Sequence, residues 1–172
     1  MFETEAELAE LQAMFDAHLE RANPHMLGIV KPSRRLTAGQ VVAYLTGTKH
    51  VAFATVTSSG APRVSPLDAL FIHGRFTMST GGDATRIAHL RRNPACSAVH
   101  MDGDRVAIVA NGTAEWITRD HPDHGEIHGA WLAEYGNDPY TWGRDIVFFR
   151  LEPRSMWAYA FHPDEFPELP LG

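Results

Sequence analysis

Between residues 51 and 159 the sequence alternates β-rich stretches with short turns, and this alternation limits the possible folds more than any other feature. Stretches rich in Val, Ile, Phe and Thr flank turn sequences at 58–61, 73–75 and 102–104. We expect strands at 51–57, 62–72, 76–80, 95–101, 105–118 and 145–152, with an extended continuation over 153–159. Five or six strands in mostly antiparallel hairpins indicate a closed small barrel, because closure removes exposed sheet edges.

Two residues inside these strands predict local irregularities. Pro66 has no backbone N–H to donate to a ladder, so its strand is expected to be bulged or at an edge there. Asn111-Gly112 interrupts the long fifth strand and indicates a bulge. Between the third and fourth strands, residues 84–92 predict a short helix that Asp83 caps and Asn93-Pro94 ends.

Helices are expected on either side of the strands. Residues 4–22 carry Leu and Phe at three- and four-residue spacing, which is typical of an amphipathic helix. Thr37 with Gln40 three residues later forms a capping box that starts a second helix. Residues 120–135 predict a third helix. The fold class is therefore mainly β with flanking helices, an α+β arrangement.

Bulk composition excludes several classes of function. The formal net charge of −6 argues against broad binding to nucleic acid or anionic membranes. The single cysteine, Cys96, permits no intrachain disulfide and favours a reducing, cytoplasmic location. We expect Cys96 to be a buried small hydrophobe rather than a reactive thiol. The acidic start of the chain lacks the pattern of a signal peptide, and no apolar run approaches the length of a membrane span.

Six sequence pieces in a fixed order resemble one known superfamily. They are the capped helix with Val51-Ala-Phe-Ala-Thr-Val56, then Gly60-Ala-Pro-Arg-Val-Ser-Pro-Leu67, Arg75-Phe-Thr-Met-Ser-Thr80, Thr85-Arg-Ile-Ala-His-Leu-Arg-Arg-Asn-Pro94, Gly112-Thr-Ala-Glu115, and Val147-Phe-Phe-Arg-Leu151 leading to Trp157. Together they resemble the pyridoxamine 5'-phosphate oxidase-like, or flavin/deazaflavin oxidoreductase, superfamily. The resemblance implies an FMN-binding split β-barrel that works as a homodimer, with the cofactor at the subunit interface.

Under this resemblance the chain divides into an N-terminal helix and basic loop (residues 1–35), the split-barrel domain (36–160) and a proline-rich acidic tail (161–172). The resemblance also implies a set of cofactor-binding positions. These are Arg63, Val64, Ser65, Pro66, Ser79, Thr80, Thr85 and Arg86, with Trp157 expected to stack near a flavin of the other subunit.

The residues themselves support a phosphate site at the start of the short helix. Thr85 and Arg86 lie in its first turn, where free N–H groups and the helix dipole favour an anion. Gly81-Gly82 lets the preceding strand turn tightly toward that helix. We expect Arg63 and Arg86 to converge on the phosphate, and we note that the Asp83 carboxylate would weaken the site unless it points away.

The chain also departs from true pyridoxamine phosphate oxidases. It ends in the acidic segment 161–168, where those enzymes carry arginine and histidine, so vitamin B6 is not the expected substrate. A flavin carries the hydride chemistry itself, and no side-chain acid–base pair stands out, so no catalytic residue is assigned. The substrate is expected to be a small molecule, and its identity cannot be read from the sequence.

Two alternatives remain open on the same fold. The first is a reductase that uses the deazaflavin coenzyme F-420, whose longer acidic tail would need Lys31, Arg34 and Arg35. The second is a non-catalytic module that binds flavin or haem, with iron ligands drawn from His73, His89 and His100.

The segment of the third helix carries three histidines that could bind a metal. His121, His124 and His128 share one helical face, and histidines four residues apart can chelate a metal. No HExxH motif is present, and Pro122 places His121 outside the helix. The sequence therefore favours a solvated polar face, and we predict no metal site.

Overall fold

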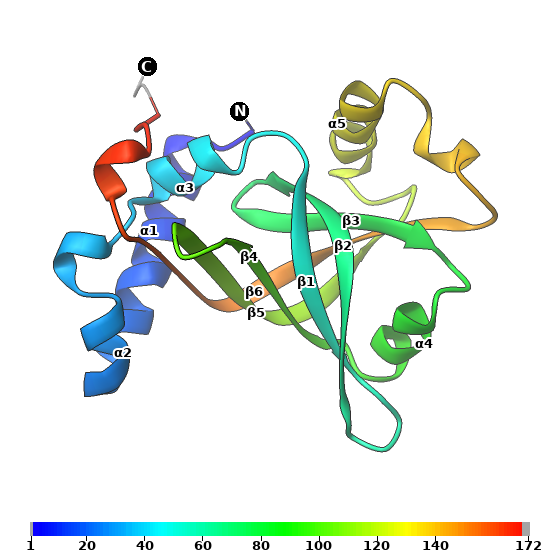
Figure 1. Cartoon of the computed structure of the whole chain (residues 1–172). Helices are drawn as coiled ribbons and strands as arrows, with labels where there is room; N and C mark the ends of the chain where they lie inside the picture. Colours follow the sequence, from blue (N-terminus) through cyan, green and yellow to red (C-terminus); the bar gives the residue numbers. More distant parts are fainter. Residues whose placement is uncertain (1, 170–172) are drawn as a thin grey trace.

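The computed structural model describes residues 2–169, in which six antiparallel strands close into a barrel. Around the barrel the strand order is β1-β2-β3-β6-β5-β4, and β4 pairs with β1 to complete the closure. Figure 1 shows the barrel between two groups of helices. The predicted closed barrel with flanking helices is confirmed. The strands are β1 (Lys49–Val56), β2 (Pro62–Ile72), β3 (Arg75–Gly81), β4 (Ala95–Asp102), β5 (Val106–Ile117) and β6 (Ile146–Ala160).

Helices close one end of the barrel and cover part of its outside. α1 (Glu5–Glu20), α2 (Pro24–Ile29) and α3 (Ala38–Tyr44) gather at one end, where α1 packs along β6 (Figure 1). α4 (Thr85–Arg92) sits near the β1–β2 hairpin. α5 (His124–Tyr135) lies against the outside of the sheet. No helix within residues 2–169 is long and apolar enough to cross a membrane.

Strand alternation separates two hydrophobic clusters. In β2, Ala69 and Phe71 point into the barrel and join its main core with Phe53, Met78 and Phe149. Leu70 and Ile72 alternate with them and point outward. There they pack under α5 against a second cluster, completed by Ile117, Ile127, Trp131 and Phe148. One strand therefore supports the barrel core on one face and α5 on the other.

Both predicted strand irregularities are present. β2 pairs with β1 at Pro66, but β3 joins β2 only from Ala69 onward, so Pro66 lies at a local edge. The β5–β6 register shifts between Asn111 and Gly112, which confirms the bulge. The segment expected as a strand plus an extended continuation is one strand, β6.

Two local predictions need correction. Asp83 does not cap α4: Ala84 occupies the N-cap position and supplies no side-chain hydrogen bond. The third helix begins at His124 rather than at residue 120, because residues 118–123 form turns ahead of it. The proline-rich tail packs against the domain, since Phe166 is buried and Gln40 donates to the carbonyls of Pro163 and Phe166. Residues 170–172 of the predicted tail lie outside the described part of the chain.

Candidate functional site

A cavity of about 670 Å³ lies on the outer side of β2 and β3, next to α5. Its volume is within the range of about 300–1,000 Å³ that is typical of small-molecule sites. The cavity is lined by polar groups from β1, β2, β3 and α4 and by aromatic rings from α5 and the segment after it. The main lining residues are His50, Pro66, Asp68, Ser79, Thr80, Arg86, Trp131, Tyr135 and Trp142.

Arg86 supplies the positive charge of the cavity. Its Nε donates to Ser65 Oγ at 3.2 Å and one terminal nitrogen donates to Thr80 Oγ1 at 2.8 Å. No Asp or Glu within residues 2–169 forms an ion pair with it, and Asp83 is exposed. Burial lowers the pKa of Arg86, yet a guanidinium stays charged at neutral pH. Of its five N–H donors, those not used by the two hydroxyls can serve a bound anion.

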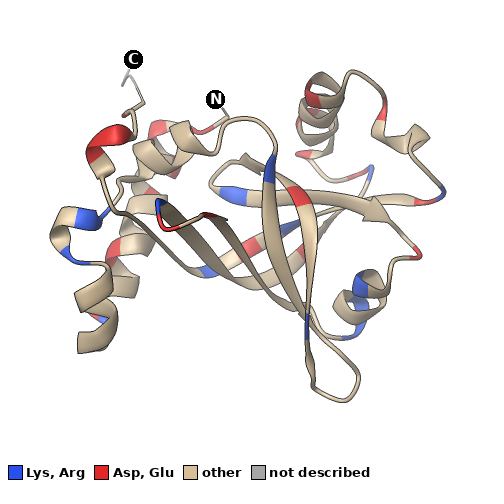
Figure 2. Cartoon of the chain, viewed as in Figure 1, with Lys and Arg blue, Asp and Glu red and all other residues tan. Residues whose placement is uncertain are grey.

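Charge around α4 is favourable to an anion as well. Figure 2 shows the basic residues of α4 close together, whereas acidic residues colour the C-terminal segment and the helices at the other end. Arg86, Arg91 and Arg92 all belong to α4. Only Arg86 lines the cavity, because the α4 backbone directs Arg91 and Arg92 elsewhere.

The aromatic wall comes from α5 and the 3-10 turn after it. Trp131 and Tyr135 stack with ring centroids 5.5 Å apart, and Trp142 meets both rings edge to face. Trp131 is 1% exposed and Trp142 is 40% exposed, so the wall runs from the interior to the rim. Such flat apolar surfaces suit a ring-shaped ligand.

On the side of the cavity formed by β1 and β2, the Asp68 carboxylate contacts two hydrogen-bonding side chains. Asp68 Oδ1 lies 2.7 Å from His50 Nδ1, and Asp68 Oδ2 accepts from the Tyr135 hydroxyl at 2.8 Å. Burial, with a further contribution from the Asp68 carboxylate, raises the pKa of the Tyr135 phenol. Tyr135 therefore remains a hydrogen-bond donor at neutral pH.

The structure brings together five of the nine cofactor-binding positions predicted from the sequence. Four of them line the cavity, namely Pro66, Ser79, Thr80 and Arg86. The fifth, Ser65, accepts a hydrogen bond from Arg86. The Gly81-Gly82 turn brings the end of β3 to the start of α4, as expected.

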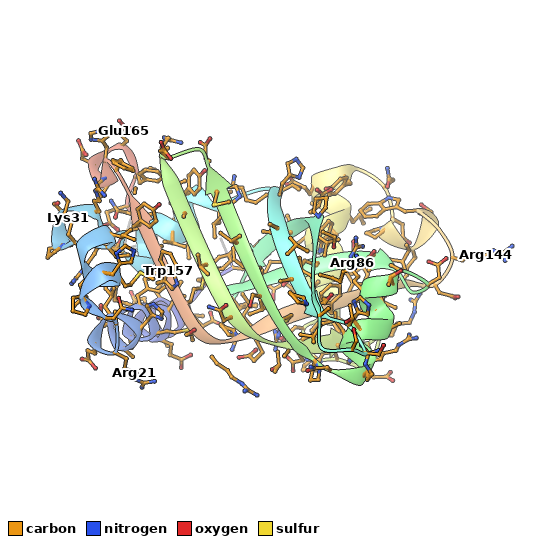
Figure 3. All side chains as sticks on the ribbon, turned by 60° about the horizontal axis from the view of Figure 1, so that its bottom comes forward. Arg21, Lys31, Arg86, Arg144, Trp157 and Glu165 are labelled. Carbon is orange, nitrogen blue, oxygen red and sulfur yellow. The ribbon has the colours of Figure 1, made fainter. Side chains whose placement is uncertain are left out.

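The other four positions lie outside the cavity. Arg63 and Val64 are exposed in the β1–β2 hairpin and do not line the cavity, and the expected convergence of Arg63 with Arg86 stays a prediction. Thr85 is exposed at the first position of α4. Trp157 lies on β6 and stacks on His18 of α1. Figure 3 shows Trp157 well apart from Arg86. Their contact with a cofactor stays a prediction, and for Trp157 it concerns the other subunit.

The groups named for the two alternatives also lie away from the cavity. The segment beside α2 carries Lys31, Arg34 and Arg35. Figure 3 shows Lys31 at the opposite end of the molecule from Arg86. Among the histidines, Glu126 and Glu7 contact both ring nitrogens of His73, and the Tyr44 hydroxyl and the His50 carbonyl contact those of His100. His89 contacts the hydroxyl of Thr55.

The histidine face of α5 is built as an aromatic stack. His124 and His128 stack at 5.8 Å between ring centroids, and both stack on Tyr140. His128 Nε2 also lies 2.9 Å from Asp138 Oδ1. His121 lies before the helix, as Pro122 indicates. Within residues 2–169, no cluster of three or more His, Cys, Asp or Glu side chains has the arrangement of a metal site.

His50, Asp68 and the residues of the aromatic wall are not among the site positions predicted from the sequence. One pattern could have found the first two residues. The turn after β1 pairs Val56 with Pro62, and counting back along this register pairs His50 with Asp68. The aromatic wall carries no such local pattern, because it depends on where α5 packs.

Comparison with known proteins agrees with this architecture. A family model described as Pyridoxamine 5'-phosphate oxidase matches residues 37–159, more than half of the chain. A comparison by sequence with curated proteins finds no match.

Three solved structures share the fold at low sequence identity. A conserved hypothetical protein of Mycobacterium tuberculosis, Rv2991, is 17% identical with a TM-score of 0.66, covering 83% of this chain and 96% of that one. The haem storage protein HutZ of Vibrio cholerae is 21% identical with a TM-score of 0.58, covering 66% and 88%. A FAD-binding protein of Mesorhizobium loti is 21% identical with a TM-score of 0.54, covering 67% and 88%. At these identities the likeness shows the fold alone.

Proposed function

The chain belongs to the pyridoxamine 5'-phosphate oxidase-like family, and on this premise we propose that it is a flavin-dependent oxidoreductase that binds FMN in the cavity beside Arg86. The observation that carries the proposal is the state of Arg86. This side chain is half buried, lacks a carboxylate partner within residues 2–169, and is oriented by two hydroxyls. A guanidinium held in this way is suited to a phosphate, which accepts charged and bidentate hydrogen bonds.

The rest of the cavity suits the remainder of such a cofactor. Ser79 and Thr80 add hydroxyls beside Arg86, and Trp131, Tyr135 and Trp142 offer flat surfaces for a ring system. When bound, a flavin supplies hydride transfer, while the protein supplies binding, orientation and exclusion of water. The substrate is a small molecule that reaches the cavity from its open side.

We propose further that the cofactor site is completed by a second copy of the chain. Val64, the neighbour of Ser65, exposes 66% of its surface, which is unusual for valine in a strand. Beside it, a second hollow of about 400 Å³ crosses β1, β4, β5 and β6 and is lined by Ala54, Val56 and Ala95 among others. A two-fold partner on this face would cover these apolar groups and bring its own residues to the cavity.

An FMN titration of the purified protein tests the proposal. Flavin fluorescence should be quenched as FMN binds, and Arg86→Ala should weaken binding by about tenfold to a hundredfold, since a charged hydrogen bond contributes about 1.5–3 kcal/mol. Arg91→Ala is the matched control, because Arg91 lies on the same helix, is exposed and does not line the cavity. Equal affinities for Arg86→Ala and wild type would place the phosphate elsewhere.

The same titration separates the two alternatives. Coenzyme F-420 in place of FMN tests the deazaflavin reductase, for which Lys31, Arg34 and Arg35 would have to come from a partner subunit. Haem titration tests the binding module, which the likeness to a haem storage protein supports. A sharp Soret band with no flavin binding would replace our proposal by the haem alternative.

A further inference from the structure

His50, Asp68 and Tyr135 form a chain of hydrogen bonds on one wall of the cavity. Asp68 lies between the other two, with His50 Nδ1 at 2.7 Å from Oδ1 and the Tyr135 hydroxyl at 2.8 Å from Oδ2. All three residues line the cavity. Asp68 lies three residues beyond Ser65 on β2, a distance of about 10 Å along a strand, so this wall is separated from the Arg86 end.

The fold fixes this arrangement from several sides. His50 and Asp68 are directly opposite each other in the β1–β2 ladder. The carbonyl of His50 accepts from His100 Nδ1 on β4 at 2.9 Å, which secures the backbone of β1. On α5, Glu134 accepts from the backbone N–H and the hydroxyl of Thr48 at 2.9 and 3.0 Å, which ties the end of the helix to the start of β1.

Hydrogen bonding determines which ring nitrogen of His50 is available. A carboxylate can only accept, so Nδ1 of His50 carries the hydrogen in its contact with Asp68. Nε2 then has no hydrogen-bond partner within residues 2–169, and His50 is an exposed residue of the cavity lining. Histidine is also the side chain best suited to give and take protons near neutral pH.

We propose that His50 exchanges a proton through Nε2 with the substrate in this cavity, that Asp68 positions its ring, and that Tyr135 holds Asp68. The inference rests on the proposed flavin-dependent function and supplies the acid–base group that the sequence did not reveal. It also points to a class of substrate, namely acceptors such as quinones, whose reduction needs a proton together with the hydride.

The proton and electron balance is closed for such an acceptor. One quinone oxygen would take the hydride that a reduced flavin supplies, and the other takes the Nε2 proton of His50 in its doubly protonated, imidazolium form, which leaves the neutral ring with its hydrogen on Nδ1. The two C=O bonds become C–OH bonds, the ring gains two electrons, and the hydroquinone leaves. His50 then recovers a proton from water, since 84% of its side chain is exposed.

The surroundings of His50 contain charges of both signs. Asp68 faces it from β2, and Lys49 is its neighbour on β1, where its ammonium binds the carbonyl of Thr46. Glu134 and Tyr135 lie on α5, and His100 lies on β4. Among residues 2–169, only Asp68 forms a hydrogen bond with the imidazole ring, so Asp68 and the residue that holds it are the positions to change.

Nitrogen NMR of the cofactor-free protein tests the positioning. At a pH where His50 is neutral, its ring should carry the hydrogen on Nδ1. Asp68→Ala should shift the hydrogen toward Nε2, and Tyr135→Phe should do so in part. His162 is an exposed histidine near the C-terminal end of the chain, and its signals should not change. A wild-type ring with the hydrogen on Nε2 would overturn the inference, whether or not the protein binds FMN.

A single-turnover experiment tests the proton transfer. Protein loaded with FMN and reduced by light is mixed with menadione, and its reoxidation is followed by absorbance. His50→Gln should slow this step by about a hundredfold, the low end of general acid catalysis, and should flatten its dependence on pH. Rates are taken at FMN concentrations that saturate each variant, so that a loss of cofactor is separated from a loss of rate, and His162→Gln should match wild type. A full rate in His50→Gln, with the pH profile unchanged, would reject the role of His50. Failure of wild type to bind FMN would instead reject the proposed function.

Discussion

Thr55 Oγ1 and His89 Nδ1 lie 2.9 Å apart, and their hydrogen bond joins β1 to the middle of α4. Thr55 is buried, so the bond is shielded from water. Because α4 carries Arg86, this contact helps to set the position of the guanidinium. We predict that Thr55→Val destabilises the protein by about 1 kcal/mol, the usual net contribution of such a bond, and also weakens FMN binding. The melting temperature should fall by about 2–4 °C. Thr55→Ser keeps the hydroxyl and should restore both properties.

The glycine at the β5–β6 bulge is expected to be irreplaceable. A Cβ at Gly112 would overlap the carbonyl oxygen of Glu152 on the neighbouring strand. Gly112→Ala should therefore destabilise the protein by at least about 1–3 kcal/mol, as overpacked sites do. Gly129 in α5 is the control, because a Cβ there meets nothing within 4 Å and alanine favours a helix. Urea unfolding should show Gly112→Ala less stable, and Gly129→Ala at least as stable, as wild type.

The stability of the N-terminal helix should depend on pH through His73. Burial disfavours the charged imidazolium, but Glu126 at 2.8 Å and Glu7 at 2.9 Å outweigh this effect and raise the pKa of His73. The folded state thus binds the proton more tightly than the unfolded chain. The resulting stabilisation is complete below about pH 6.5, the ordinary value for histidine, and is lost as the pH rises through the raised pKa.

We therefore predict a specific loss in one variant. His73→Gln should be less stable than wild type near pH 6, and the difference should shrink toward pH 8.5. His25→Gln changes an exposed histidine of α2 and should follow the wild-type curve. Thermal unfolding across this pH range measures the effect, and a constant difference between His73→Gln and wild type would contradict it.

Cys96 should resist thiol reagents in the folded protein. Burial raises the pKa of its thiol to about 12. At pH 8 only about one molecule in ten thousand would carry the reactive thiolate. Reaction with a chromogenic disulfide should be undetectable over minutes in buffer and complete in guanidinium chloride. Rapid reaction in buffer would show that this part of β4 opens readily.

Oligomeric state tests the role assigned to Val64. Wild type should sediment as a dimer, at twice 19.1 kDa. Val64→Glu should shift it toward the monomer and weaken FMN binding, because the charge would be buried at the interface. Leu132→Glu changes an exposed leucine on α5 and should leave the dimer intact. A wild-type monomer at micromolar concentration would contradict the proposed interface.

Local patterns in the sequence explain why the barrel could be predicted. Short turns join β1 to β2, β2 to β3 and β4 to β5, so the pairing of these strands follows from neighbours in the chain. The contact of Arg86 with Thr80 was also accessible, because only the Gly81-Gly82 turn separates β3 from α4. Arg63 does not line the cavity of its own chain, because β2 continues past the end of β3 and the hairpin leaves the cavity there.

The aromatic wall could not be predicted for a different reason. Trp131 and Tyr135 lie more than fifty residues after β1 and β2, which form the opposite side of the cavity, and their helix has apolar residues on more than one side. The sequence of α5 therefore does not say which face of the barrel it covers. Trp142 lines the cavity of its own chain and Trp157 does not, and the position of Trp142 likewise depends on where α5 packs.

The alternation of side chains along β2 has a consequence for how proteins of this shape can diversify. Pro66 and Asp68 face the cavity, whereas Ala69 and Phe71 face the barrel interior. Substitutions at the outward positions can change ligand preference while the inward positions keep the same packing. Ligand choice and folding can thus vary independently within a single strand, and new chemistries can arise on this scaffold without rebuilding its interior.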